Sequence, residues 1–169
     1  TAVDGWLSNE ATALETYGDI NTWDVSSIDD FSNLFSYERN RSAYSFNSNI
    51  SNWNVSNGIN FSNMFYTCES FNQDISSWDV SKGNNFSGMF KWASIFNGDL
   101  DNWNVSSGNN FNNMFFGANE FSGDISRWDV SSGTDFSYML CAEKFNSEIG
   151  NWDVSNGTNF NSMFLYTNE

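Results

Sequence analysis

The sequence predicts an α/β repeat solenoid, a right-handed coil with one short parallel strand and one short helix in each repeat of about 25 residues. A W-[DN]-V-S phrase occurs six times, and its tryptophans are separated by 30, 25, 25, 25 and 24 residues. Self-similarity at such a fixed period is typical of stacked repeat arrays. Aromatic residues, Met, and Ile or Leu recur at fixed places after each tryptophan and are the candidate core. The six copies begin at Trp23, Trp53, Trp78, Trp103, Trp128 and Trp152.

Residues 1–17 do not fit the repeat and are predicted to form an N-terminal helical cap. Their apolar side chains recur at helical intervals, and Ser8 or Asn9 is suited to interrupt two short helical turns. Since the open apolar end of the first coil must be covered, we expect Trp6 and Leu7 to be buried against it.

Residues 18–169 are predicted to form six coils, the last of them truncated, and each coil divides in two, a strand and a short helix joined by a turn. With the tryptophan as position 1, the alternation of apolar and polar residues around it predicts a half-buried strand. Glycine at position 6 in five copies predicts a turn and supplies a residue that is free to take positive φ. Asn or Asp at position 8, ahead of F-x-x-M-F, predicts an N-capped short helix. A later Phe-Asn pair predicts an inward ladder of asparagines between coils.

The repeated phrase resembles the BspA-like surface-protein repeat, a mycoplasma-type form of the leucine-rich-repeat superfamily in which aromatic residues and Met replace most leucines. The resemblance covers roughly residues 18–169 in six near-copies. It implies a leucine-rich-repeat-like coil. It also implies a secreted or cell-surface scaffold, because known members are mostly surface proteins of bacteria and protists without an assigned biochemical activity.

The composition narrows the classes of partner. The chain has 6 Lys and Arg residues against 21 Asp and Glu, a formal net charge of −15. Electrostatic association with nucleic acid or an anionic membrane is therefore repulsive, whereas a protein or a neutral glycan remains suitable. No apolar run is long enough to span a membrane, so direct membrane insertion is not expected. The first residues do not read as a signal peptide, and a targeting signal is expected to lie outside this segment.

Enzymatic activity is not expected. The chain has no His, which removes the usual base at neutral pH and the Ser-His-Asp and Cys-His mechanisms. Polar residues recur at equivalent sites, whereas an active site needs its nucleophile, base or metal placed once. The two cysteines, Cys68 and Cys141, would lie roughly 14 Å apart on stacked strands and are expected to be free and buried.

The main candidate binding surface is the outward row at position 2, which we call the position-2 row. Strands about 4.8 Å apart would align these side chains along one face, where they are predicted to contact a protein or glycan. No cofactor is expected; Ca²⁺, which prefers oxygen ligands, is the one metal considered, at Asp79, Asp129 and Asp153. A solvated acidic face is the alternative interpretation. The row comprises Asp24, Asn54, Asp79, Asn104, Asp129 and Asp153.

A second candidate is the first coil, which is five residues longer than the others because of an insertion within 36–45 that carries Arg39 and Arg41. Departures from the period often mark binding faces, although a tolerated insertion is the other explanation.

Together these features predict a non-enzymatic binding or adhesion scaffold that recognises a protein or glycan at a cell surface. The alternative is a structural subunit docked in a larger assembly, because the apolar end of the last coil must meet further repeats or a partner protein. We also expect a segment of a longer protein, since Thr1 is not Met and the last repeat stops at Glu169, before its second Phe.

Overall fold

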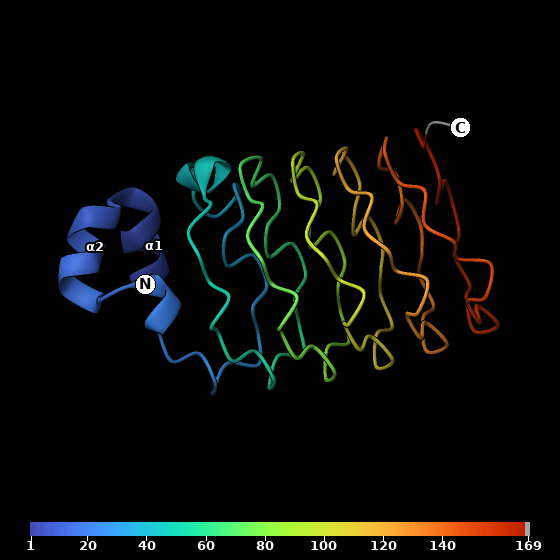
Figure 1. Cartoon of the computed structure of the whole chain (residues 1–169), viewed down its shortest axis with the longest axis horizontal. Coiled ribbons are helices and arrows are strands. Elements are labelled where there is room, and N and C mark those ends of the chain that lie inside the picture. Colours follow the sequence, from blue (N-terminus) through green and yellow to red (C-terminus); the bar gives the residue numbers. More distant parts are fainter. Residues whose placement is uncertain (168–169) are drawn as a thin grey trace.

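The computed structural model describes residues 1–167 of the chain as a long stack of coils with a small helical unit at one end (Figure 1). The helical unit consists of α1 (Ala2–Ser8) and α2 (Glu10–Tyr17). Two short 3-10 helices follow, η1 (Ile20–Thr22) and η2 (Arg41–Ser45). We number the coils 1 to 6 by the tryptophan phrase that each contains, and that tryptophan remains position 1.

Capping residues set the limits of the two α-helices. Thr1 and Asp4 form a capping box, in which each side chain accepts a hydrogen bond from the backbone of the other. Asn9 accepts a bond from the backbone N–H of Thr12 at 3.1 Å and so starts α2. Gly18, with φ 75°, ends α2, because glycine takes this backbone conformation without a steric cost.

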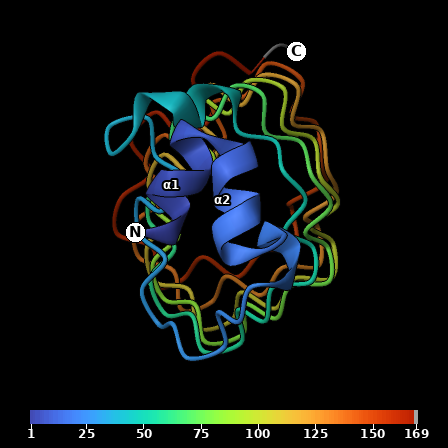
Figure 2. The same cartoon turned by 90° about the vertical axis from the view of Figure 1, so that its left-hand side faces the viewer.

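The helices lie over the end of the stack, where they cover coil 1 (Figure 2). Trp6 of α1 is 5% exposed, and its ring meets Trp23 edge-on with centroids 5.6 Å apart. Leu7 is partly buried against the same core. Helix α2 buries Ala13. The apolar end of coil 1 is therefore closed mainly by α1.

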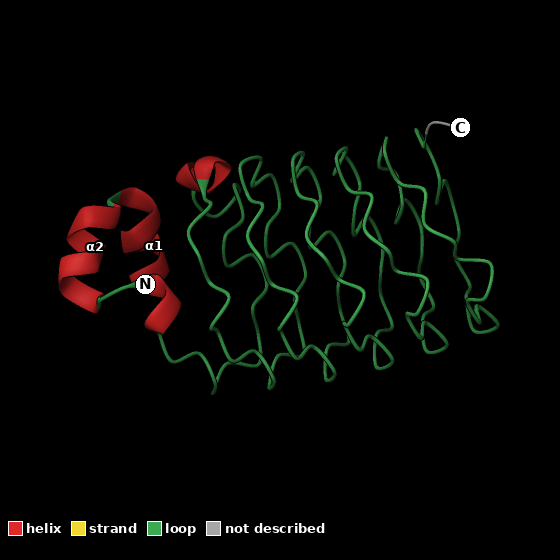
Figure 3. Ribbon diagram, viewed as in Figure 1, coloured by secondary structure: helices red, strands yellow, loops and turns green. Residues whose placement is uncertain are grey.

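The predicted α/β repeat solenoid, with its leucine-rich-repeat-like strand and helix in each coil, is wrong. Beyond α2, the described residues form turns, loops and the two 3-10 helices, and contain no named strand (Figure 3). The β pairing found within 1–167 is one isolated parallel bridge between each pair of neighbouring coils, at position 8. These bridges join Asp30 to Asn60, Asn60 to Asn85, Asn85 to Asn110, Asn110 to Asp135, and Asp135 to Asn159.

The F-x-x-M-F segment is not helical because its middle residue, position 11, has a left-handed backbone in every coil. A left-handed residue cannot continue a right-handed helix. The N–H groups around it bond to the next coil instead: Phe61 donates to Asn85 O at 2.8 Å and Asn63 donates to Ser87 O at 2.8 Å. The φ angles at position 11 are 55° at Asn33, 53° at Asn63, 61° at Gly88, 56° at Asn113, 55° at Tyr138 and 52° at Ser162.

The W-[DN]-V-S phrase does not form a strand because a turn follows it at once. Its tryptophan bonds back along the stack through the side chain, as Trp78 Nε1 donates to Ile50 O at 3.2 Å. The backbone N–H of Trp78 donates to Ile75 O, three residues earlier in the chain, at 3.1 Å. The phrase thus has apolar side chains directed to the core without the backbone ladder of a sheet.

The core consists of phenylalanine columns that run through the coils. Phe65 lies between Phe35 and Phe90, with ring centroids 5.6 Å apart on each side and interplanar angles of 4° and 9°. It also meets Phe71 of its own coil at 4.0 Å. These four rings are 0% exposed. Because burial of such large apolar surfaces is the main stabilising contribution to a fold, these columns hold the coils together without strands.

The position-6 glycines lie at the ends of turns but do not take the positive φ that is open to glycine. The glycines with positive φ among residues 1–167 are Gly18, Gly88 and Gly117. At Gly83 a Cβ atom would lie 2.3 Å from Phe86 Cζ and 2.9 Å from Val80 O. In coils 2 to 6 glycine stands at position 6 because the position-9 ring occupies the space of a Cβ; coil 1 has Ile28 at this position.

The asparagine ladder exists but is exposed, not inward. Asn47 Oδ1 accepts a bond from the backbone N–H of Asn72 at 2.9 Å, and Asn72 Oδ1 accepts one from Asn97 N at 2.9 Å. Cys68 and Cys141 are free and buried, as predicted. Burial raises the pKa of the Cys68 thiol. Within residues 1–167, every helix is too short or too polar to cross a membrane.

Candidate functional site

The side chains of the position-2 row are exposed at the same place in successive coils. Each accepts a hydrogen bond from the backbone N–H of the serine two residues later. Asp79 Oδ1 accepts a hydrogen bond from the N–H of Ser81 at 3.0 Å, which closes an Asx turn. The Ser81 hydroxyl and N–H hold the pKa of Asp79 below its ordinary value. The equivalent bonds measure 3.0 Å at Asp24, 3.2 Å at Asn54, 3.1 Å at Asn104, 3.0 Å at Asp129 and 3.0 Å at Asp153.

Each Asx turn gives the position-2 row a structural role. An amide oxygen accepts the same backbone bond as a carboxylate, which explains why Asp and Asn both occur in the row. The hydrogen bonds also lower the pKa values of Asp24, Asp129 and Asp153, and at Asp153 the backbone N–H of Ser155 has the largest effect. The carboxylates are therefore ionised at neutral pH, on the surface.

The residues considered for Ca²⁺ do not form a metal site. Asp79 lies in coil 3, Asp129 in coil 5 and Asp153 in coil 6. Among residues 1–167 there is no group of three or more His, Cys, Asp or Glu side chains placed to hold a metal ion. Since Ca²⁺ takes about six to eight oxygen ligands, one or two carboxylates that already accept backbone bonds do not fit it.

Two further Asx turns occur in the repeat: at position 8 the bond from side chain to backbone was predicted, but as part of a helix, and the turn at position 22 was missed. At position 8, Asn85 Oδ1 accepts from the backbone N–H of Ser87 at 3.1 Å, where a helix N-cap was predicted. At position 22, Asp74 Oδ1 accepts from the N–H of Ser76 at 3.0 Å. The signal for these turns is an Asp or Asn two residues before a serine, which recurs at these places. Most acidic and amide residues of the repeat thus shape the coil.

The two arginines of the insertion 36–45 differ in their surroundings. Arg39 Nε lies 3.1 Å from Asp4 Oδ1, and its guanidinium also donates to Thr1 Oγ1 at 3.0 Å. The hydrogen bond from Arg39, followed by that from Thr1, holds the pKa of Asp4 well below its usual range. Arg41 begins η2 and is exposed. Arg39 therefore ties the insertion to α1, and Arg41 is the member that faces solvent.

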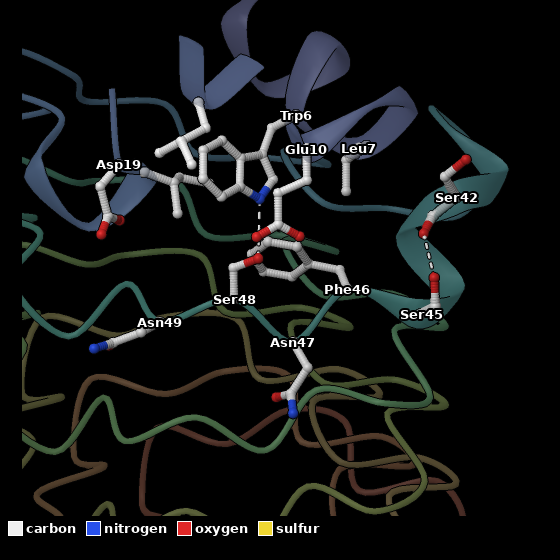
Figure 4. A pocket seen from close by; sticks show the side chains of 12 residues that line it. Trp6, Leu7, Glu10, Asp19, Ser42, Ser45, Phe46, Asn47, Ser48 and Asn49 are labelled. Atoms are coloured by element: carbon white, nitrogen blue, oxygen red, sulfur yellow. Dashed lines mark hydrogen bonds between the residues drawn. The ribbon is translucent and has the colours of Figure 1, made fainter. Parts of the chain in front are cut away.

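A pocket of about 560 Å³ lies between the cap and coil 1 (Figure 4). Trp6 and Phe46 supply apolar lining, and Trp6 Nε1 donates to Ser48 Oγ at 2.9 Å. Glu10 and Asp19 add carboxylates to the lining. Most of the lining residues are polar, whereas a small-ligand site usually has a predominantly apolar wall with a few polar groups.

A second pocket, of about 630 Å³, brings together two of the residues predicted from the sequence. Asp24 and Arg39 both line it, with Trp23, Ile28 and Phe31 among its apolar walls. The remaining members of the position-2 row belong to coils 2 to 6 and line neither of the two pockets.

A line of aromatic side chains on coils 2 to 5 was not identified from the sequence. We call it the aromatic row. It consists of Tyr66 and Phe116 at position 14, Trp92 at position 15 and Tyr138 at position 11. Trp92 and Phe116 meet edge-on with ring centroids 5.0 Å apart, and Phe116 meets Tyr138 at 6.0 Å. Lys91 Nζ lies 5.7 Å from the Tyr66 ring and 5.6 Å from the Phe116 ring. The sequence feature that could have revealed this row is that positions 14 and 15 differ from coil to coil.

Comparison with known proteins places the repeat without giving it an activity. Residues 6–122 and 98–169 match a family described as "Mycoplasma protein of unknown function, DUF285". No curated protein and no solved structure matches the chain.

Proposed function

The chain belongs to the DUF285 family of Mycoplasma-type proteins of unknown function, and we propose that it is a non-enzymatic binding or adhesion scaffold that recognises a protein or glycan. The observation that carries this proposal is the register of the coils. Backbone bonds join neighbouring coils in a constant register, such as the bond from Phe65 N at position 13 to Met89 O at position 12 of the next coil, which measures 2.9 Å. Surface side chains at one position therefore form a row along the stack, and an extended regular surface is the usual binding device of repeat proteins.

Secretion or display at a cell surface is part of the proposal. It is supported by the likeness of the repeat to BspA-like surface proteins. The free, buried cysteines need no particular redox environment and so favour no compartment. The net charge of −15 favours neutral or cationic partners over nucleic acid.

The test immobilises residues 1–169 and measures binding to a panel of neutral and charged glycans and of surface proteins, with and without EDTA. We expect saturable binding to one class of partner and no dependence on EDTA. A matched variant replaces the four aspartates of the position-2 row by asparagine, which keeps the Asx turns and removes four charges; unchanged binding would place the contact elsewhere on the surface. Absence of any saturable partner in the panel would refute the binding function. The four aspartates are Asp24, Asp79, Asp129 and Asp153.

A second candidate function is that of a structural subunit in a larger assembly. Coil 6 exposes apolar side chains whose counterparts are buried in coils 2 to 4: Phe160 is 41% exposed and Phe164 is 50% exposed. An exposed apolar surface of this kind is typical of a contact face. Light scattering separates the two candidates, since a subunit should associate with concentration and an isolated binder should remain monomeric.

A further inference from the structure

The aromatic row lies outside the positions that hold the coils together. The neighbouring positions 12, 13 and 16 carry buried residues such as Met89, Phe90 and Ala93, each 0% exposed. Trp92, at position 15, is 43% exposed, and Tyr66 and Phe116 are partly exposed. These rings contribute little to the buried core, and exposing them to water is unfavourable. An exposed line of aromatic side chains is therefore a candidate binding surface.

The rings are held in place before any ligand arrives. A Cβ on Gly117 would lie 2.2 Å from Cε3 of Trp92, so the indole rests directly on the backbone of the next coil. Phe116 meets the same indole edge-on at 79°. At the far end, the Tyr138 hydroxyl accepts a bond from Asn161 Nδ2 at 3.3 Å. Side chains fixed in this way lose little conformational entropy on binding.

We propose that the aromatic row binds an uncharged, extended β-linked polysaccharide that runs along the stack. This inference rests on the proposed binding function and names its ligand class. The C–H groups on the face of a pyranose ring are weakly positive, and they pack against the negative face of an aromatic ring. Neighbouring rings of the row have centroids 5.0 Å apart at Trp92 and Phe116 and 6.0 Å apart at Phe116 and Tyr138, which is comparable with the length of one sugar residue in such a chain.

Polar groups beside the row suit the hydroxyls of a sugar. Lys91 supplies an ammonium group between two rings of the row. Asn113, three residues before Phe116 in coil 4, is partly exposed and uses one of its two side-chain N–H groups in a 2.6 Å bond to Asn112 Oδ1. Both amide and ammonium groups donate hydrogen bonds to neutral oxygen.

The charge of the molecule selects against other occupants. At a net charge of −15, polyanionic glycans and nucleic acids are repelled. A second copy of the chain would bring the same charge to the same surface, so pairing of two rows is disfavoured by self-repulsion. An uncharged polysaccharide meets neither of these electrostatic repulsions.

Calorimetric titration of the intact protein with hexamers of β-1,4-linked glucose and of β-1,4-linked N-acetylglucosamine tests the inference. We expect at least one hexamer to bind, and Trp92→Ala to weaken that binding roughly tenfold, as loss of one aromatic contact does. Trp92→Leu keeps apolar packing on Gly117 but lacks the aromatic face, and should weaken binding similarly. The control is Ile59→Ala, which removes an equally exposed apolar side chain, 49% exposed, at position 7.

Equal affinity of Trp92→Leu and the unmodified protein, at unchanged melting temperature, would overturn the inference. So would failure of both hexamers to bind. If a protein partner from the panel is still captured and Trp92→Ala does not alter it, the glycan inference fails while the binding function stands. If light scattering shows a dimer that Trp92→Ala dissolves, the row is a self-association surface and the inference is wrong.

Discussion

Substitution of a position-6 glycine should destabilise the stack through steric overlap alone. In Gly83→Ala the new Cβ would lie 2.3 Å from Phe86 Cζ and 2.9 Å from Val80 O. Phe86 is 0% exposed and is stacked between Phe61 at 5.6 Å and Phe111 at 5.7 Å. The ring cannot move without disturbing both neighbours. Overpacking of a rigid core costs about 1–3 kcal/mol, so we expect the free energy of unfolding to fall by that amount.

Urea denaturation followed by tryptophan fluorescence measures this loss. The matched control is Gly150→Ala, because a Cβ there meets nothing within 4 Å and the residue has no positive φ. That change should be neutral or raise the free energy of unfolding by up to about 1 kcal/mol, since alanine restricts the unfolded chain. If Gly83→Ala proves as stable as Gly150→Ala, the overlap with the Phe86 ring is not what requires glycine at position 6.

Three further predictions concern the acidic residues and the cap. Asp79→Asn should leave the melting temperature nearly unchanged because the amide still accepts from Ser81, whereas Asp79→Ala should lower the free energy of unfolding by about 1 kcal/mol; equal effects would exclude the Asx turn as the reason for the residue. Carboxylates with lowered pKa values are stabilising above their unfolded pKa, and this contribution is lost as pH falls through the folded pKa. The melting temperature should therefore be level at neutral pH and fall below about pH 4; a rise in that range would contradict the lowered values. Arg39→Ala should loosen the cap, lower the melting temperature by a few degrees and change the fluorescence of Trp6, whereas Arg41→Ala should do neither; identical behaviour of the two would show that the bond to Asp4 contributes nothing measurable.

The period and the core were predictable from the sequence because both follow from side chains. Phenylalanine at a fixed place in every copy can be buried only if the copies stack, and the rings of Phe61 and Phe86 do stack, at 2° between planes. The predicted strand failed for a local reason. Alternation over so few residues does not distinguish a strand from an extended segment, and Asp79 with Ser81 forms a turn that ends the extension.

The predicted helix failed because F-x-x-M-F fits more than one backbone. Its apolar residues lie on one face of a helix, but they also reach the core when position 11 is left-handed. Asn33, Asn63 and Asn113 at that position are compatible with a left-handed residue, as is Gly88. Tyr138 takes the same conformation although tyrosine rarely does, with φ 55°. The bonds between coils therefore impose the conformation, and they are not visible in one repeat read by itself.

The candidate site was predictable from the sequence only in part. The exposure of the position-2 row was correctly predicted, while its binding role remains a prediction. Residues shared by every coil are explained by turns, columns and steric limits, so they do not distinguish one partner from another. The proposed binding function would take its selectivity from places where the coils differ. Positions 14 and 15 differ most visibly: Tyr66 and Thr67 stand in coil 2 where Lys91 and Trp92 stand in coil 3.

This division between shared and variable positions has a direct consequence for Trp92. Thr67 occupies position 15 of coil 2 with φ 58°, and Trp92 has φ 60°, so threonine fits the backbone of that position. Replacing Trp92 by threonine therefore changes the surface of coil 3 to that of its neighbour without asking for a new conformation. A row that exists for packing would lose stability from this exchange, whereas a row that exists for a ligand would lose binding and keep its melting temperature.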